Sequence, residues 1–233
     1  MSLIELKHIS KIYNETKVPV TALQDVSLTV EKGDFAALVG PSGSGKTTAL
    51  NIIGGLDTPT SGKVFIDGKN LAELKSDELI NFRLHHIGFV FQAYNLIPVF
   101  TARENVEFIM LLQKMPKAER TRRAVELLTA VGLSDRLDAR PAELSGGQQQ
   151  RVAVARALAS RPSFVLADEP TANLDTASAF SLLEIMETLN HDCQMTFVFS
   201  THDPRVIKRA HRVITLQDGQ IVSDTINENA HDD

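Results

Sequence analysis

The glycine-rich segment Gly40-Pro-Ser-Gly-Ser-Gly-Lys-Thr47 constrains the fold of this chain more than any other stretch. It follows the continuous apolar run Phe35–Val39, which is typical of a buried strand, and it precedes a pattern that predicts a helix. Glycines let a backbone wrap closely around an anion, and the amide groups and dipole of a helix N-terminus attract phosphate. We therefore expect a strand–loop–helix unit that binds the phosphates of a nucleotide.

Two side chains of this loop have separate expected roles. The Lys46 ammonium can reach the β- and γ-phosphates, and the Thr47 hydroxyl can be a ligand of Mg²⁺. The residues expected to contact the nucleotide here are Gly40, Pro41, Ser42, Gly43, Ser44, Gly45, Lys46, Thr47 and Thr48. The motif alone predicts a nucleotide, and not the kind of protein that uses it.

Two acids end a second apolar run, Phe164–Ala167. A strand-end carboxylate beside a phosphate loop can hold Mg²⁺ through water, and we assign that role to Asp168. Glu169 follows it and is placed to orient or deprotonate an attacking water molecule. The alternative, a solvated pair of acids at a strand end, is the weaker interpretation once the phosphate loop is present.

Predicted strands alternate with helices on either side of a helical stretch. The expected strands are Leu3–Tyr13, Ala22–Glu31, Phe35–Val39, Lys63–Ile66, Ile87–Phe91, Phe164–Ala167, Met195–Ser200, Arg212–Leu216 and Gln220–Val222. Between residues 101 and 160 the apolar period is helical, which predicts an α/β core (1–95 and 162–233) with an inserted helical subdomain at about 96–161. The polar tail after Ser223 is expected to fray.

Composition argues against several kinds of protein. The formal net charge is −5, which disfavours a nucleic-acid binder that relies on a basic face. Apolar runs are shorter than a membrane span and the N-terminus has no apolar signal core, so we expect neither a spanning nor a secreted protein. The single cysteine, Cys193, is interpreted as a tolerated thiol in the connecting segment Asn190–Gln194 rather than a nucleophile.

The segment Leu144-Ser-Gly-Gly-Gln-Gln-Gln-Arg151 is the most specific of all. Its serine and glycines cap a predicted helix, whose N-terminus forms a second anion site in the same chain. In this order after the phosphate loop, the segment resembles the signature of ATP-binding-cassette ATPases. The resemblance covers about residues 3–224. It implies a P-loop core of the RecA type with an antiparallel β subdomain and an inserted α-helical subdomain.

The resemblance implies roles for four further residues. Tyr13 resembles the aromatic residue that stacks on adenine, although a tyrosine at a strand end also has a structural interpretation. Gln92 resembles the glutamine that contacts Mg²⁺ and senses the transport partner, and His202 resembles the histidine that senses the γ-phosphate. Asp175 ends a loop that resembles the one crossing the dimer interface, although that loop more often begins with serine than with alanine. The other six histidines are interpreted as surface or structural residues.

The family resemblance implies a head-to-tail pair of cassettes, for which we favour a homodimer, with two MgATP buried between them. The signature residues that would face the partner's phosphate loop are Ser145, Gly146, Gly147 and Gln148. The implied catalytic residues are Glu169, His202, Lys46 and Gln92. The implied Mg²⁺ ligands are Thr47, Gln92 and Asp168.

Residues 54–62, 91–98, 101–106 and 166–175 resemble the branch of the family that releases lipoproteins or exports macrolides. That branch implies integral membrane permease subunits as partners and a peripheral position at the cytoplasmic face of the inner membrane. Residues Ala93–Phe100 are the expected docking surface, and packing within the helical subdomain is the alternative. The apolar cluster of this surface is Tyr94, Leu96, Ile97, Val99 and Phe100.

Two other functions compete with that of a transporter subunit. A soluble cassette ATPase acting on nucleic acid or ribosomes would need a long coiled coil or two cassettes in one chain, and the sequence has neither heptads nor a second set of motifs. A non-catalytic scaffold is disfavoured because Lys46, Asp168, Glu169 and His202 are all present. The sequence does not identify the cargo.

Overall fold

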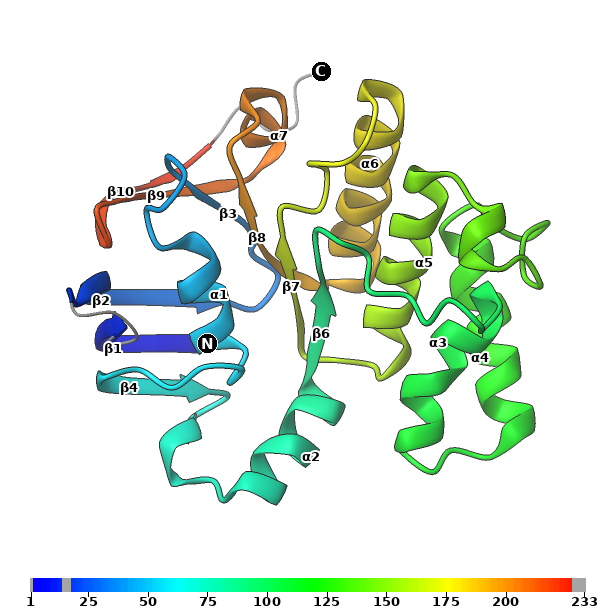
Figure 1. Ribbon diagram of the computed structural model, residues 1–233, viewed down its shortest axis with the longest axis horizontal. Helices are drawn as coiled ribbons and strands as arrows, with labels where there is room; N and C mark the ends of the chain where they lie inside the picture. Colours follow the sequence, from blue (N-terminus) through cyan, green and yellow to red (C-terminus); the bar gives the residue numbers. More distant parts are fainter. Residues whose placement is uncertain (1, 14–17, 228–233) are drawn as a thin grey trace.

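The computed structural model describes residues 2–13 and 18–227, which form two sheets and the helices around them (Figure 1). The N-terminal part contains β1 (Ser2–Tyr13), β2 (Val20–Glu31), β3 (Phe35–Val39), α1 (Lys46–Ile53), β4 (Ser61–Ile66), β5 (Lys69–Asn70), α2 (Ser76–His86) and β6 (Ile87–Val90). The central part contains α3 (Ala102–Leu112), α4 (Lys117–Ala130) and α5 (Gly146–Ala159). The C-terminal part contains β7 (Phe164–Asp168), α6 (Thr176–Cys193), β8 (Thr196–Thr201), α7 (Pro204–Arg209), β9 (Arg212–Gln217) and β10 (Gln220–Ile226).

A six-stranded sheet in the order β10-β9-β3-β8-β7-β6 carries the core. From β9 to β6 its strands are parallel, and the central strands β3 and β8 are short and buried on both faces. Val39 pairs with Thr201, and Asp168 pairs with Ser200. The carboxyl ends of β3, β8 and β7 therefore meet at one edge, which is where open α/β sheets bind their ligands.

A second sheet, β2-β1-β4-β5, is antiparallel. The core has two halves, one on each face of β3. Alternate residues of β3 belong to different halves, because successive side chains on a strand point to opposite faces. Ala36 and Leu38 pack with the antiparallel sheet and α1, whereas Phe35 and Ala37 pack with α3, α5 and α6. In Figure 1 the antiparallel sheet and the helices α3 to α5 lie on opposite sides of the six-stranded sheet.

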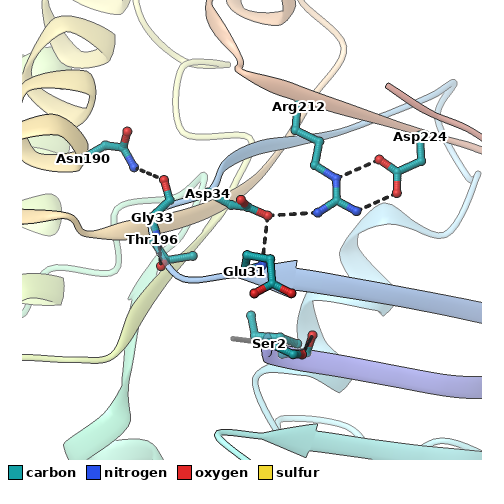
Figure 2. Close-up of polar contacts among 9 residues, drawn as sticks. Ser2, Glu31, Gly33, Asp34, Asn190, Thr196, Arg212 and Asp224 are labelled. Atoms are coloured by element: carbon teal, nitrogen blue, oxygen red, sulfur yellow. Dashed lines mark hydrogen bonds and ion pairs between the residues drawn. The ribbon is translucent and has the colours of Figure 1, made fainter. Parts of the chain in front are cut away.

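Arg212 joins three parts of the chain at the outer edge of the sheets (Figure 2). Its guanidinium donates to both carboxylate oxygens of Asp224 on β10, at 2.8 and 2.7 Å, and to Asp34 in the β2–β3 turn at 2.9 Å. Asp34 in turn accepts from the Glu31 amide at 3.0 Å. These pairs raise the pKa of Arg212 well above its ordinary value, so the ion pairs persist across the whole physiological range.

The expected fold class is confirmed, two expectations about elements need correction, and one helix is additional to those expected. The helix α2 was not expected, because its apolar residues form no single stripe and only Phe82 is buried. The strand β10 continues past Ser223 to Ile226, where fraying was expected, and residues 228–233 lie outside the described residues. Cys193 is the last residue of α6 rather than part of a loop, and it is exposed. No described helix is long and apolar enough to cross a membrane.

Candidate functional site

The phosphate loop joins β3 to α1 at the ligand edge of the sheet. Gly45 precedes α1 at φ 103°, and a Cβ there would lie 2.5 Å from the carbonyl oxygen of Ala22, so only glycine fits. The first turn of α1 has no side-chain cap and no acidic residue. Its free amide groups and its dipole therefore face an anion site.

Lys46 is the first residue of α1 and is only 7% exposed. Its ammonium donates to the carbonyl oxygens of Gly40 at 2.8 Å and Pro41 at 3.0 Å, and no acidic side chain in the described part of the chain pairs with it. A buried ammonium held only by carbonyls favours a nearby anion. The environment of Lys46 therefore supports phosphate binding independently of the sequence motif.

The two acids at the end of β7 are held by a serine that sequence reasoning did not identify. Ser200 is fully buried on β8, donates to Asp168 Oδ1 at 2.6 Å and accepts from the Glu169 amide at 2.8 Å. The Thr47 hydroxyl donates to the same oxygen of Asp168 at 3.1 Å. The three elements α1, β7 and β8 thus converge on one carboxylate oxygen.

Glu169 adopts φ 47°, in the left-handed region that a residue of this kind rarely occupies. Its carboxylate, 16% exposed, lies 2.9 Å from Nδ1 of His202, which is 69% exposed just after β8. The strained backbone turns the Glu169 side chain away from the strand and towards His202. A carboxylate and an imidazole in contact can orient and deprotonate a water molecule.

Lys46, Glu169 and His202 line one cavity of about 630 Å³, a volume typical of small-molecule sites. Its lining residues are Val20, Thr21, Ala22, Pro41, Ser42, Gly43, Gly45, Lys46, Thr47, Thr48, Gln92, Glu169 and His202. Gln92 reaches this cavity from the loop after β6, and Asn173 donates to its carbonyl oxygen at 3.0 Å. The cavity therefore brings together the expected Lys46, Gln92, Glu169 and His202, while Gly40, Ser44 and Asp168 are not among its lining residues.

Thr47 and Asp168 offer two oxygen ligands for a hard cation. No group of three or more histidine, cysteine or acidic side chains is gathered for a metal in residues 2–13 and 18–227. This sparse donor set fits Mg²⁺, which keeps several waters and shares its remaining positions with substrate phosphates rather than a full protein cage.

The predicted signature residues form a capped helix end away from this cavity. Ser145 accepts from the Gln148 amide at 3.3 Å, and Gln148 accepts from the Ser145 amide at 3.0 Å, which makes a capping box at the start of α5. Gly146 leaves room for the Tyr94 hydroxyl, which would lie 2.8 Å from a Cβ. None of residues 145–148 is among those that line the phosphate cavity of the same chain.

Asp175 caps the next helix, α6, rather than lining the cavity. Its carboxylate accepts from the Ser178 hydroxyl at 2.6 Å and from the Ser178 amide at 3.0 Å. These hydrogen bonds lower the pKa of Asp175.

Tyr13 lies next to the cavity and is anchored from behind. Its hydroxyl donates to Asp57 at 2.7 Å, and the Lys11 ammonium lies 4.8 Å from the centre of its ring. Partial burial and then the hydrogen bond to Asp57 raise the pKa of Tyr13. Its neighbour at the cavity wall is Thr48, and Tyr13 itself is not a lining residue.

The parallel strand ends, the phosphate loop and the paired strand-end acids define the class of P-loop nucleotide hydrolases. The chain belongs to the ABC transporter family, whose model matches residues 23–172. The expectation of an ATP-binding-cassette ATPase that uses ATP and Mg²⁺ is thereby confirmed.

Relatives and solved structures agree with this family. The chain is 46% identical to the macrolide export ATP-binding/permease protein MacB of Brucella melitensis, over 98% of this chain and 35% of that protein. It is also 46% identical to the uncharacterized ABC transporter ATP-binding protein YvrO of Bacillus subtilis, over 98% of this chain and 100% of that protein. A dimeric post-hydrolysis structure of the ATP-binding cassette MJ0796 with ADP and Pi matches with a TM-score of 0.89 and 42% identity, covering 97% of this chain and 99% of that one. The chain thus spans about a third of the length of the macrolide exporters that it matches.

Proposed function

We propose that this chain hydrolyses ATP at the phosphate-loop cavity and transmits the resulting conformational change to a membrane permease. The observation that carries the proposal is the convergence of Lys46, Glu169 and His202 on one cavity beside the Thr47–Asp168 oxygen pair. The loop amides and Lys46 bind the phosphates, and Glu169 directs water at the γ-phosphate. His202 steadies Glu169 and the developing charge, while bound Mg²⁺ would supply charge neutralisation between the phosphates.

The working form that we propose is a head-to-tail pair of chains. The signature helix end is an anion site, yet it lies apart from the phosphate cavity of its own chain. A second copy can bring Ser145 and the α5 N-terminus to the open side of the cavity, so that each ATP contacts both chains. The dimeric state of the MJ0796 cassette supports this arrangement.

The permease partner is inferred from the family and from an apolar groove. This groove, of about 600 Å³, lies between α2, β6, α3 and α5. Leu56, Ile80 and Leu112 are large apolar residues exposed at its rim. A membrane subunit at the cytoplasmic face of the cell membrane would cover it, in the manner of a helix that docks in a groove. Relatives that are named ATP-binding/permease proteins support the pairing, and the lipoprotein and macrolide branch is the one we favour.

The groove includes Asn95 and Ile97 of the segment expected from the sequence, but it takes in little of that segment's apolar cluster. Of that cluster, Ile97 alone lines the groove. Leu96 packs against the core, and Phe100 packs with Phe108, their ring centres 5.8 Å apart. A charge at Leu96 or Phe100 would therefore disturb folding, so neither substitution is a clean test of docking.

Two substitutions test the hydrolytic site. Glu169→Gln keeps the shape of the side chain but removes the base, so we expect ATP turnover to fall by roughly 10²–10⁴ while ATP binding persists. Lys46→Ala removes the phosphate contact, so turnover or binding should be lost. Both are measured by phosphate release and by binding of radiolabelled ATP. Normal turnover in Glu169→Gln would refute the role of that residue, and normal turnover in Lys46→Ala would refute the phosphate site.

A matched pair on α3 tests the groove. Leu111 and Leu112 are neighbours with similar exposure, 48% and 51%, but Leu112 alone lines the groove. Leu112→Asp should reduce co-purification with the permease from native membranes and leave the ATPase activity of the isolated chain unchanged. Leu111→Asp should do neither. Equal co-purification of both variants would assign docking to another surface.

The experiment that identifies the partner uses tagged Glu169→Gln held with ATP in native membranes. Mass spectrometry of what co-purifies should recover an integral membrane protein with few spans and a large extracytoplasmic domain. Recovery of ribosomal proteins or nucleic acid alone would overturn the transport role and leave the ATPase in place.

A further inference from the structure

The apolar groove between α2, β6, α3 and α5 contains positive charge without any acid. Arg83 on α2 and Arg156 on α5 both line it, and no aspartate or glutamate is among the described residues that do so. The whole chain has a net charge of −5, so this is a local reversal of its overall sign. Two arginines within an apolar docking surface can select a partner by its charge.

Arg156 is partly buried, and among the described residues its guanidinium contacts only neutral groups. It donates to the carbonyl oxygen of Tyr94 at 2.8 Å and to that of Asn95. Burial alone lowers its pKa, with no carboxylate among the described residues to oppose the shift. A buried guanidinium without a counter-ion costs folding free energy, which an incoming carboxylate could offset.

Arg83 faces the same groove from the opposite side. Its guanidinium donates to the carbonyl oxygen of Gly55 at 2.8 Å, again a neutral acceptor. Ile80, one turn before Arg83 on α2, and the adjacent Leu84 also line the groove. The surface therefore offers apolar walls with two forked donors between them.

We propose that the groove binds a permease segment that presents apolar side chains around an aspartate or glutamate, whose carboxylate pairs with Arg156 and is flanked by Arg83. This deepens the proposed function, on which it rests, by assigning the chemistry of the docking partner. A neutral apolar segment would pack against the groove walls but would leave both guanidinium groups without a counter-ion. A basic segment would be repelled by them.

The contact has a direct path to the ATP site. Arg156 holds Tyr94 and Asn95, whose φ values of 58° and 50° lie in the left-handed region. Gln92, two residues before Tyr94 in the same loop, lines the phosphate cavity. A carboxylate that engages the same guanidinium therefore acts on the group that fixes the conformation of the Gln92 loop.

The test uses three helical peptide probes that differ at one position. Each carries leucine and phenylalanine along one face, and the central residue of that face is glutamate, glutamine or lysine. Binding to the full chain with ADP is followed by fluorescence anisotropy up to millimolar peptide, at low and at moderate salt. We expect the glutamate peptide to bind roughly ten-fold more tightly than the glutamine peptide, and the lysine peptide to bind weakest. The preference for glutamate should shrink as salt rises.

Two variants locate the effect. Arg83→Gln should reduce the preference for the glutamate peptide several-fold, whereas Arg122→Gln, on the exposed face of α4 outside the groove, should leave it unchanged. Arg156→Lys keeps the charge but loses the fork, and it should reduce the preference as well.

Equal affinity for the glutamate and glutamine peptides would overturn the proposal, as would no binding of any peptide. Displacement of the glutamate peptide by oleate, with oleate the tighter ligand, would assign the groove to a lipid instead and would also overturn it. Each of these results can coexist with permease co-purification and a normal ATPase, in which case the proposed function stands and the acidic partner fails.

Discussion

Ser200 holds Asp168 and Glu169, the two acids to which we assign roles in hydrolysis, in position relative to each other. Its hydroxyl bonds the Asp168 carboxylate and the Glu169 amide, and it is fully buried. Ser200→Ala leaves that amide and one carboxylate oxygen short of a partner, which should cost about 1–3 kcal/mol of unfolding free energy. Loss of such a supporting contact should also lower ATP turnover by roughly 10–100-fold.

Urea denaturation and steady-state phosphate release measure these two effects. The control is Ser223→Ala, which removes an exposed hydroxyl bonded to Thr215 on the outer hairpin, and it should change neither quantity. A Ser200→Ala variant with normal turnover at full saturation with Mg²⁺ would show that Asp168 and Glu169 keep their positions without the serine.

The contrast between Ser200 and Glu169 marks what sequence could predict at the residue scale. Glu169, Lys46 and the signature lie in contiguous motifs, where spacing along the chain fixes the chemistry. Ser200 is one small residue of an apolar strand, and its role arises from pairing opposite Asp168 across the sheet. The register between β7 and β8 determines that contact, so the sequence of β8 alone does not predict it.

Among the elements, the hairpin β9–β10 depends on Arg212 for its attachment to the β2–β3 turn (Figure 2). Arg212→Ala leaves the partly buried Asp34 and Asp224 without a cation, so we expect a loss of about 2 kcal/mol in unfolding free energy. The exposed pair of Arg122 with Glu126, 3.8 Å apart, is the control, and Arg122→Ala should cost less than about 0.5 kcal/mol. Thermal and urea unfolding of both variants make the comparison, and equal stability would mean that the Arg212 network contributes no more than a surface pair.

Elements with a clear period were predictable, and those stabilised only by distant contacts were not. The buried strands Phe35–Val39 and Phe164–Asp168 and the helix after the phosphate loop agree with the sequence within a residue or so. The sequence of α2 shows no amphipathic face, because Phe82 is the residue of this helix that is buried and Ile80 is exposed. The groove is likewise assembled from α2, β6, α3 and α5, which no local window contains. The limits 96–161 for the helical subdomain stay a prediction.

At the scale of the whole molecule, the two helix N-termini that we assign as anion sites do not meet within one chain. The phosphate cavity lies at the α1 N-terminus, and the capped start of α5 belongs to neither its lining nor its hydrogen-bond network. A protein that hydrolysed ATP as a monomer would have no use for the second site. Complementary half-sites explain both, because a two-fold arrangement makes each chain supply what the other lacks.

Complementation between two inactive variants tests this arrangement. Lys46→Ala removes the phosphate site, and Ser145→Arg places a bulky cation at the signature, where the exposed serine leaves room for it within its own chain. Each variant alone should lack turnover. When the two are mixed, half of the dimers pair unlike chains, and each such dimer has one site with an intact phosphate loop and an intact signature. We therefore expect occlusion of one ATP in each mixed dimer and recovery of about a quarter of the wild-type sites. Phosphate release and nucleotide trapping after co-refolding measure both, and a mixture as inactive as its components would mean that each chain builds its whole site alone.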